Sequence, residues 1–116
     1  MTSLVTVAFV AHPVGPDGPP RVANLARAER WLRWLILQHE AVAFVVPWLP
    51  YCHVLDESHR DRGFRDNMAT LAMCGSIVLV GGELSPGMRV ELDFAKSRGL
   101  PVVDYLHLGP EPPRIA

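Results

Sequence analysis

Residues 76–88 read SIVLVGGELSPGM and join a short apolar run to the start of a helix. The run Ser76–Val80 is rich in β-branched residues, which is typical of a strand buried on both faces of a parallel sheet. The glycine pair that follows ends the strand. Ser85 is a favoured N-cap residue, and Pro86 suits the first position of a helix. This order of strand, loop and helix predicts an α/β fold.

The same alternation continues in both directions along the chain. Strands are expected at Leu4–Ala11, Ala41–Val46, Ser76–Val80 and Pro101–Tyr105. Helices are expected at Arg21–Gln38, through Phe64–Ala72, and from Pro86 to the turn before Gly99. The first helix shows an apolar stripe of Val22, Leu25, Leu32, Leu35 and Ile36. The pattern predicts a Rossmann-like, open and mostly parallel sheet of four or five strands with flanking helices.

Composition narrows the class of protein. The chain has 116 residues, 49% of them hydrophobic, and a net charge of -1. The balance of charge gives no reason to expect nucleic acid as a partner, and no apolar run is long enough to cross a bilayer. Two cysteines, Cys52 and Cys74, show no metal-ligand spacing. We expect a cytoplasmic domain that needs no metal and no cofactor.

Proline clusters mark the loops and the end of the chain. Four prolines lie between Pro13 and Pro20, where a long loop is expected, and three lie between Pro110 and Pro113. We therefore predict one domain over residues 1–109 and a proline-rich tail over residues 110–116 that leaves it.

In open α/β sheets, ligands bind beyond the carboxyl ends of the strands. The loops at His12, Pro47 and Gly81 start there. The loop at Gly81 leads to a helix N-terminus, where unpaired N–H groups favour a phosphate or carboxylate, although an ordinary capped loop fits equally well. Glu91 lies in the middle of the apolar arc of that helix, formed by Met88, Val90, Leu92, Phe94 and Ala95. A buried carboxylate needs a partner, so Glu91 is either satisfied for structural reasons or lines the crevice as a nucleophile or base.

The segment Ser85-Pro86-Gly87-Met88-Arg89-Val90-Glu91, followed by Ala95, Gly99, Pro101 and Val102, resembles the S-x-G-M-x-x-E signature of nucleoside 2-deoxyribosyltransferase-like proteins, closest to a branch found in bacteria and phages. The likeness also covers Ala11–Gly15, Arg62-Gly63 and Leu71-x-x-Cys74. It implies a flavodoxin-like sheet, usually assembled as dimers or larger oligomers.

The resemblance implies roles for particular residues. Glu91 would attack C1′ of a nucleoside or nucleotide, and Ser85 would bind the 5′ side of the sugar. Of two family aspartates, the first falls on Asn67, with Asp66 beside it, and the second falls on Gly75. Asp66 could therefore be the acid, but on a continuous helix it would face solvent or a partner. The expected substrate contacts are His12, Pro13, Gly15, Asn67, Gly81, Ser85, Gly87 and Met88.

Other polar and aromatic residues carry weaker signals. His53, Asp56, Glu57 and His59 could suggest a metal, but their spacing favours a solvated loop. Trp48 and Tyr51 could form an aromatic wall for a base or could simply pack in the core.

These expectations together predict cleavage or transfer at the N-glycosidic bond of a nucleoside or nucleoside 5′-monophosphate. The alternative is a non-catalytic module that binds or senses a nucleotide.

Two tryptophans of the first helix predict how the chain assembles. Trp34 lies opposite the apolar stripe and Trp31 lies at its flank. Left in water, they would form an apolar patch that monomers rarely expose, so a homo-oligomer, most simply a dimer, is expected. Alternatively, the proline loop or the C-terminal tail covers them within one chain.

Overall fold

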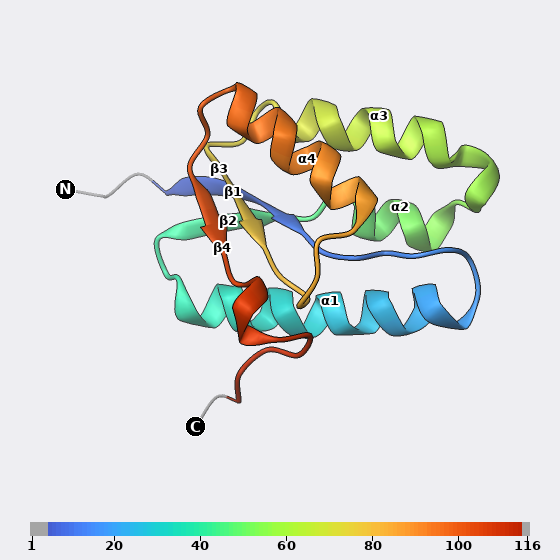
Figure 1. Cartoon of the computed structure of the whole chain (residues 1–116), viewed down its shortest axis with the longest axis horizontal. Coiled ribbons are helices and arrows are strands. Elements are labelled where there is room, and N and C mark those ends of the chain that lie inside the picture. Colours follow the sequence, from blue (N-terminus) through green and yellow to red (C-terminus); the bar gives the residue numbers. More distant parts are fainter. Residues whose placement is uncertain (1–4, 115–116) are drawn as a thin grey trace.

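The computed structural model describes residues 5–114 and contains a four-stranded sheet between two layers of helices (Figure 1). All strand pairs are parallel, and the strand order is β2-β1-β3-β4. The strands are β1 (Thr6–Ala11), β2 (Val42–Val45), β3 (Ser76–Leu79) and β4 (Val102–Asp104). This architecture confirms the predicted α/β class and is consistent with a flavodoxin-like fold. Leu4, the expected start of the first strand, lies outside the described residues.

Within residues 5–114, four α-helices and one short 3-10 helix connect the strands, and a second 3-10 helix follows β4. They are α1 (Pro19–Gln38), α2 (Trp48–Val54), η1 (Glu57–His59), α3 (Arg60–Leu71), α4 (Pro86–Ser97) and η2 (Leu106–Leu108). The apolar pattern did not predict α2, because this helix of 7 residues, about two turns, is too short to show a period. No helix within residues 5–114 combines the length and apolar character needed to cross a membrane.

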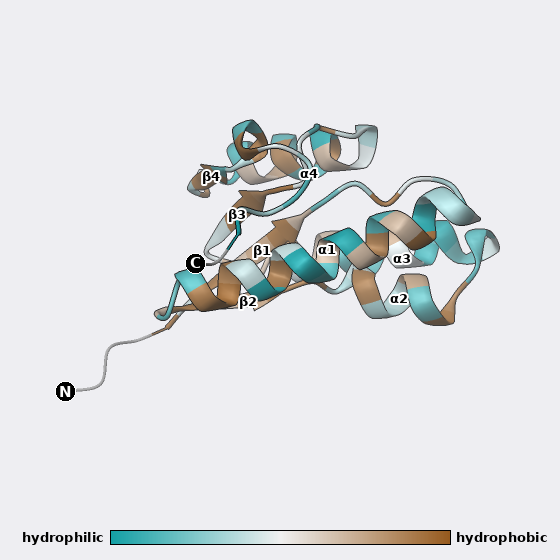
Figure 2. Cartoon of the chain, turned by 90° about the horizontal axis from the view of Figure 1, so that it is seen from below, coloured by the Kyte–Doolittle hydropathy of each residue, from teal (hydrophilic) through white to brown (hydrophobic). Residues whose placement is uncertain are grey.

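The register of the sheet divides the core in two. Val10 of β1 pairs with Val78 of β3, and both lie in the apolar cluster that Trp31 and Leu35 of α1 cover. The neighbouring residues Phe9 and Ile77 point to the other face, where residues of α3 and α4 pack. β1 and β3, the two central strands, are largely hydrophobic in Figure 2, as expected for strands buried on both faces.

The predicted stripe of α1 is wrong in part. Val22 is 69% exposed and Ile36 is 53% exposed, whereas Ala28 and Trp31 are buried. The true buried line of α1 runs through Leu25, Ala28, Trp31 and Leu35. An apolar pattern on a wheel does not reveal this line, because both faces of α1 carry apolar side chains.

The expectation that both tryptophans are left in water is also wrong. Trp31 is fully buried and donates a hydrogen bond from Nε1 to the carbonyl of Pro110 over 2.7 Å. Trp34 meets Tyr105 edge to face, with ring centroids 5.4 Å apart. The segment after β4 therefore covers these rings within one chain, and its start packs on the domain instead of leaving it. The far end of the predicted tail, residues 115–116, lies outside the described residues.

Candidate functional site

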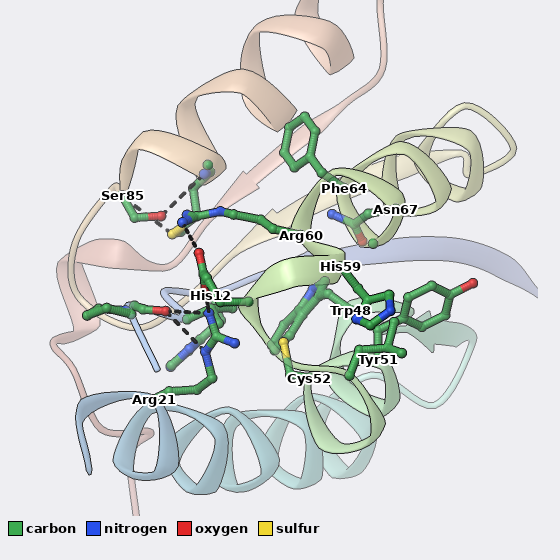
Figure 3. Close-up of a pocket in the computed structure, with 18 of the residues that line it drawn as sticks. His12, Arg21, Trp48, Tyr51, Cys52, His59, Arg60, Phe64, Asn67 and Ser85 are labelled. Carbon is green, nitrogen blue, oxygen red and sulfur yellow. Dashed lines mark hydrogen bonds and ion pairs between the residues drawn. The ribbon is translucent and has the colours of Figure 1, made fainter. Parts of the chain in front are cut away.

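A cavity of about 350 Å³ opens where the carboxyl ends of the strands meet the helices (Figure 3). His12 follows β1, Trp48 follows the end of β2, and Ser85 follows β3, and all three line the cavity. These residues lie at the three loops, starting at His12, Pro47 and Gly81, that the sequence predicts at the ligand-binding edge of the sheet. The beginning of α3 and the 3-10 helix before it complete the wall.

Glu91 of α4 lies in the wall of this cavity and is only 6% exposed. Asn67 Nδ2 donates a hydrogen bond to Glu91 Oε2. Burial raises the pKa of Glu91 to about 7, and the hydrogen bond from Asn67 opposes that rise. Near neutral pH the Glu91 carboxyl group is therefore partly protonated and partly ionised, and the ionised form is the nucleophile.

Asn67 reaches Glu91 from α3, so two helices supply this buried pair. Asn67 lies one turn before Leu71 on the buried face of α3 and is 4% exposed. Its Oδ1 is buried and accepts no hydrogen bond from residues 5–114. A buried acceptor without a donor costs roughly 1–3 kcal/mol, so an apolar residue here would stabilise the fold more. This cost is a feature expected at a functional position.

Ser85 caps α4 as predicted. Its Oγ accepts a hydrogen bond from the Met88 N–H over 3.3 Å, and its own N–H faces the Met88 sulfur at 3.5 Å. The cap uses Ser85 as an acceptor, so its O–H proton can still be donated to a ligand. A Cβ added at Gly87 would meet no atom within 4 Å, so the backbone at the start of α4 is open to a ligand.

Val90, expected on the buried arc of α4, is 47% exposed. The residues that α4 buries are Met88, Glu91, Leu92 and Ala95. Glu91 thus takes a central place on the buried face, which is why the sequence pattern placed it in the crevice.

His12 is buried and held in one orientation. Its Nδ1 lies 2.7 Å from the carbonyl of Pro13, and its Nε2 lies 3.4 Å from the Nε of Arg27. Because Arg27 Nε can only donate, the imidazole carries its proton on Nδ1 and accepts at Nε2. Burial lowers the pKa of His12 to about 4, so the ring is neutral at physiological pH.

Three aromatic rings line the cavity: Trp48, Tyr51 and Phe64. Trp48 donates from Nε1 to the carbonyl of Val10 over 2.8 Å, which fixes its ring. It stacks on His12 with ring planes 17° apart. Phe64, the first residue of the predicted second helix, is 38% exposed and lines the cavity. The aromatic wall is therefore present.

The sequence did not predict a cluster of three charged side chains at the mouth of the cavity. Arg21 Nη2 and Arg60 Nη1 bind the two oxygens of Glu57 over 2.9 Å and 2.6 Å. In Figure 3 the Arg60 side chain extends toward Ser85. Arg21 and Arg60 stand in the first turns of α1 and α3. First turns of helices in a parallel sheet adjoin the carboxyl ends of the strands, and that position was the available signal.

Asp66 does not line the cavity, although it was the candidate acid. Its carboxylate accepts hydrogen bonds from Tyr51 at 2.8 Å, from Arg62 at 2.9 Å and from Arg65 at 3.0 Å. Arg62 and Tyr51 lower the pKa of Asp66 to about 2, so it holds no proton to donate near neutral pH. On the continuous helix α3, Asp66 points away from Glu91 while its neighbour Asn67 points toward it.

Of the eight predicted contact residues, two support the site from behind. Pro13 and Gly81 are buried but do not line the cavity. A Cβ at Gly81 would come within 2.7 Å of both His12 and Pro13, so Gly81 lets the ends of β1 and β3 approach closely. Gly81 also has a φ of 104°, which L side chains rarely adopt. The other six, His12, Gly15, Asn67, Ser85, Gly87 and Met88, line the cavity.

The acidic and histidine residues of the 53–59 segment do not form a metal site. Within the described residues, no group of three or more His, Cys, Asp or Glu side chains could hold a metal ion. His53 instead lies 3.5 Å from Glu29, and His59 lies 3.2 Å from Asp56.

Comparison with known proteins gives one result that covers most of the chain. No curated protein matches the sequence. Residues 7–105 match the family model described as "Domain of unknown function (DUF7768)". The match begins in β1 and ends just after β4, and thus contains every element that lines the cavity. The chain belongs to this DUF7768 family.

Proposed function

We propose that the protein cleaves or transfers, in the cytoplasm, at the N-glycosidic bond of a nucleoside or nucleoside 5′-monophosphate, with Glu91 as the nucleophile. The observation that carries the proposal is the buried Glu91 carboxyl group in the wall of an aromatic-lined cavity. A carboxylate at a core position of a helix lowers stability, and this favours a chemical role for Glu91.

The reaction would follow the retaining route of glycosidases. A Glu91 carboxylate oxygen attacks C1′ of the sugar, and the bond from C1′ to the base breaks, with its electron pair passing to the base. Water or a second base then attacks C1′ and releases Glu91 as a carboxylate. The hydrogen bond from Asn67 orients the attacking group. Since the pKa of Glu91 is about 7, this step requires the ionised form and should become faster as the pH rises through neutrality.

The cavity also offers groups for a 5′-phosphate. Ser85 and the exposed backbone at Gly87 lie at the N-terminus of α4, where a negative charge is favoured. Arg60 and Arg21 stand at the same cavity; Glu57 pairs with both of them, and Asp17 also pairs with Arg21. A phosphate could replace Glu57 as the partner of Arg60, which is the more exposed of the two arginines.

A specific observation favours a second candidate function. Asp66, the expected acid, is ionised and lies outside the cavity. Without a proton donor the departure of an ordinary base is slow, so the cavity would then serve to bind or sense a nucleotide.

The experiment is an incubation of the protein with a panel of nucleosides and their 5′-monophosphates, in which free base is measured by chromatography. We expect base release from wild type and none from Glu91→Gln, which keeps the volume and removes the charge. Calorimetric titration adds the test of binding. Binding by both proteins without base release would favour the sensing module, and no binding by either would contradict both candidates.

Ser85→Ala separates a phosphate role from a purely structural cap. If Ser85 donates to the 5′-phosphate, the variant weakens binding of a monophosphate more than binding of the matching nucleoside. Equal losses for the two ligands would mean that Ser85 only caps α4.

An oligomer remains part of the proposal, although the tryptophans no longer argue for it. On α1, Ile36 and Leu37 are 53% and 56% exposed, and they form an apolar patch near the C-terminal end of the helix. Light scattering on wild type and on Ile36→Glu tests whether this face joins two copies. A wild-type mass of one chain would refute the oligomer.

A further inference from the structure

Among the described residues around Glu91, no side chain is an acid placed to protonate the departing base. His12 is neutral, and its one ring proton is directed to the carbonyl of Pro13. The Tyr51 hydroxyl donates to Asp66, and this bond raises the pKa of Tyr51. Burial raises the pKa of the Cys52 thiol, which makes it a weaker acid than usual.

The carboxyl groups at the mouth of the cavity are also ionised. Hydrogen bonds from Ser58 and His59 lower the pKa of Asp56, and the bond from Arg60 lowers the pKa of Glu57. The imidazole of His59 lies at the exposed rim, with Nδ1 3.2 Å from Asp56. The group that faces Glu91 from α3 is the amide of Asn67, which is no acid.

This arrangement determines which bases can depart. When the bond from C1′ to a neutral base breaks, the electron pair makes the base an anion, and an acid must protonate it. When the base already carries a positive charge, as in a pyridinium or an N7-alkylated purine, the same electron pair makes it neutral. Such a base needs no proton from the protein.

The same cavity suits a flat cation. The rings of Trp48, Tyr51 and Phe64 line it, and aromatic faces attract cations. The Glu91 carboxylate lies in the wall and, once ionised, adds a buried negative charge with one hydrogen bond from the protein. A cationic base would partly neutralise that charge, as a neutral base would not.

We infer that the substrate is an N-glycoside whose base is a cation, such as a ribosyl pyridinium or an N7-alkylated purine nucleoside or its 5′-monophosphate. The inference rests on the proposed function of Glu91 and names its substrate class. In the first step a Glu91 oxygen bonds to C1′, the C1′–N bond breaks and the base leaves neutral. In the second step water replaces Glu91 at C1′ and one proton passes to solvent, so that glycoside cation and water yield neutral base, free sugar and a proton.

The test compares guanosine with 7-methylguanosine, which differ by one methyl group and one positive charge, and adds nicotinamide riboside and its 5′-monophosphate. Release of base is measured for wild type and Glu91→Gln. General acid catalysis contributes about 100-fold or more, so without an acid the kcat/KM for 7-methylguanosine should exceed that for guanosine by at least about 100-fold. For nicotinamide riboside, whose positive charge does not depend on pH, the kcat/KM should rise through the pKa of Glu91 to a plateau that persists to high pH, since no acid is lost.

Three results would overturn the inference. Cleavage of guanosine within tenfold of 7-methylguanosine would show that an acid is present, while the proposed function would stand. A bell-shaped pH profile that loses its falling limb in His59→Gln would identify His59 as that acid. No release of any base by wild type would contradict the proposed function itself, and with it the inference.

Discussion

Two buried titratable groups, Glu91 and His12, should give the protein an unusual dependence of stability on pH. The pKa of Glu91 is raised by burial to about 7 from the ordinary value of 4.5. The folded state therefore favours the protonated carboxyl, and its contribution to stability is full below pH 4.5 and is lost as the pH rises toward 7. The pKa of His12 is lowered by burial from 6.5 to about 4. Its contribution is full above pH 6.5 and is lost as the pH falls toward 4.

Between pH 4.5 and 6.5 the two effects oppose each other. Each changes the free energy of unfolding by about 1.4 kcal/mol per pH unit, with opposite signs. Their sum is close to zero over this window in wild type. In Glu91→Gln only the effect of His12 remains, so the free energy of unfolding should rise by about 3 kcal/mol from pH 4.5 to 6.5. Above pH 7 the variant should be more stable than wild type by about 3 kcal/mol, because it buries no charge.

Urea unfolding at half-unit steps of pH measures both quantities. The surface carboxylates titrate alike in the two proteins, so their effects cancel in the difference between the curves. His12→Asn is the mirror control, and its stability should fall across the same window. Parallel curves for wild type and Glu91→Gln would refute the reasoning, because they would mean that the carboxyl of Glu91 has the same pKa in the folded and unfolded states.

Three further substitutions test separate parts of the structure. Trp31→Phe keeps an aromatic ring in the core but removes the hydrogen bond to Pro110 and leaves a cavity, so it should lower the free energy of unfolding by more than about 1 kcal/mol and speed proteolysis of the C-terminal segment. Gly81→Ala should lower it by more than about 2 kcal/mol, because of the positive φ and the close approach of the segment after β1, whereas the control Gly87→Ala should leave it nearly unchanged in urea unfolding. Asp66→Asn should leave base release within about twofold of wild type and weaken acid resistance between pH 4 and 2; a loss of release as large as that of a nucleophile variant would restore it as the acid.

Apolar runs and turn residues predicted the strands well, because a central parallel strand is buried on both faces and therefore shows an almost continuous apolar run. Ser76–Leu79 and the capped start of α4 are where expected. The buried face of α1 was harder to predict, since Ile36 and Trp31 are both apolar and only tertiary packing selects between them. The bond from Trp31 to Pro110 spans 79 residues, and no local pattern reports such a contact.

The candidate site, like the fold, could be predicted from the sequence only in part. Glu91 stood out because a carboxylate interrupts an apolar arc, and the structure places it in the cavity wall. The choice between Asp66 and Asn67 depended on helix phase. Two adjacent residues point about 100° apart on a helix, so the placement of one in the cavity directs the other away. A carboxylic acid is the more common proton donor, but the phase of α3 places the amide of Asn67, and not the carboxyl group of Asp66, beside Glu91.

The pair formed by Asn67 and Glu91 lowers the stability of the fold around it. Both residues stand on helix faces that otherwise bury apolar side chains. Asn67 leaves an acceptor without a donor in the described residues, and Glu91 is held where its charge is costly. Two apolar residues would fill the same space without either cost. Sequences that depart from local rules at adjoining positions commonly do so at functional sites. The cost of the pair is therefore itself an argument that its ligand, and not the fold, accounts for these two residues.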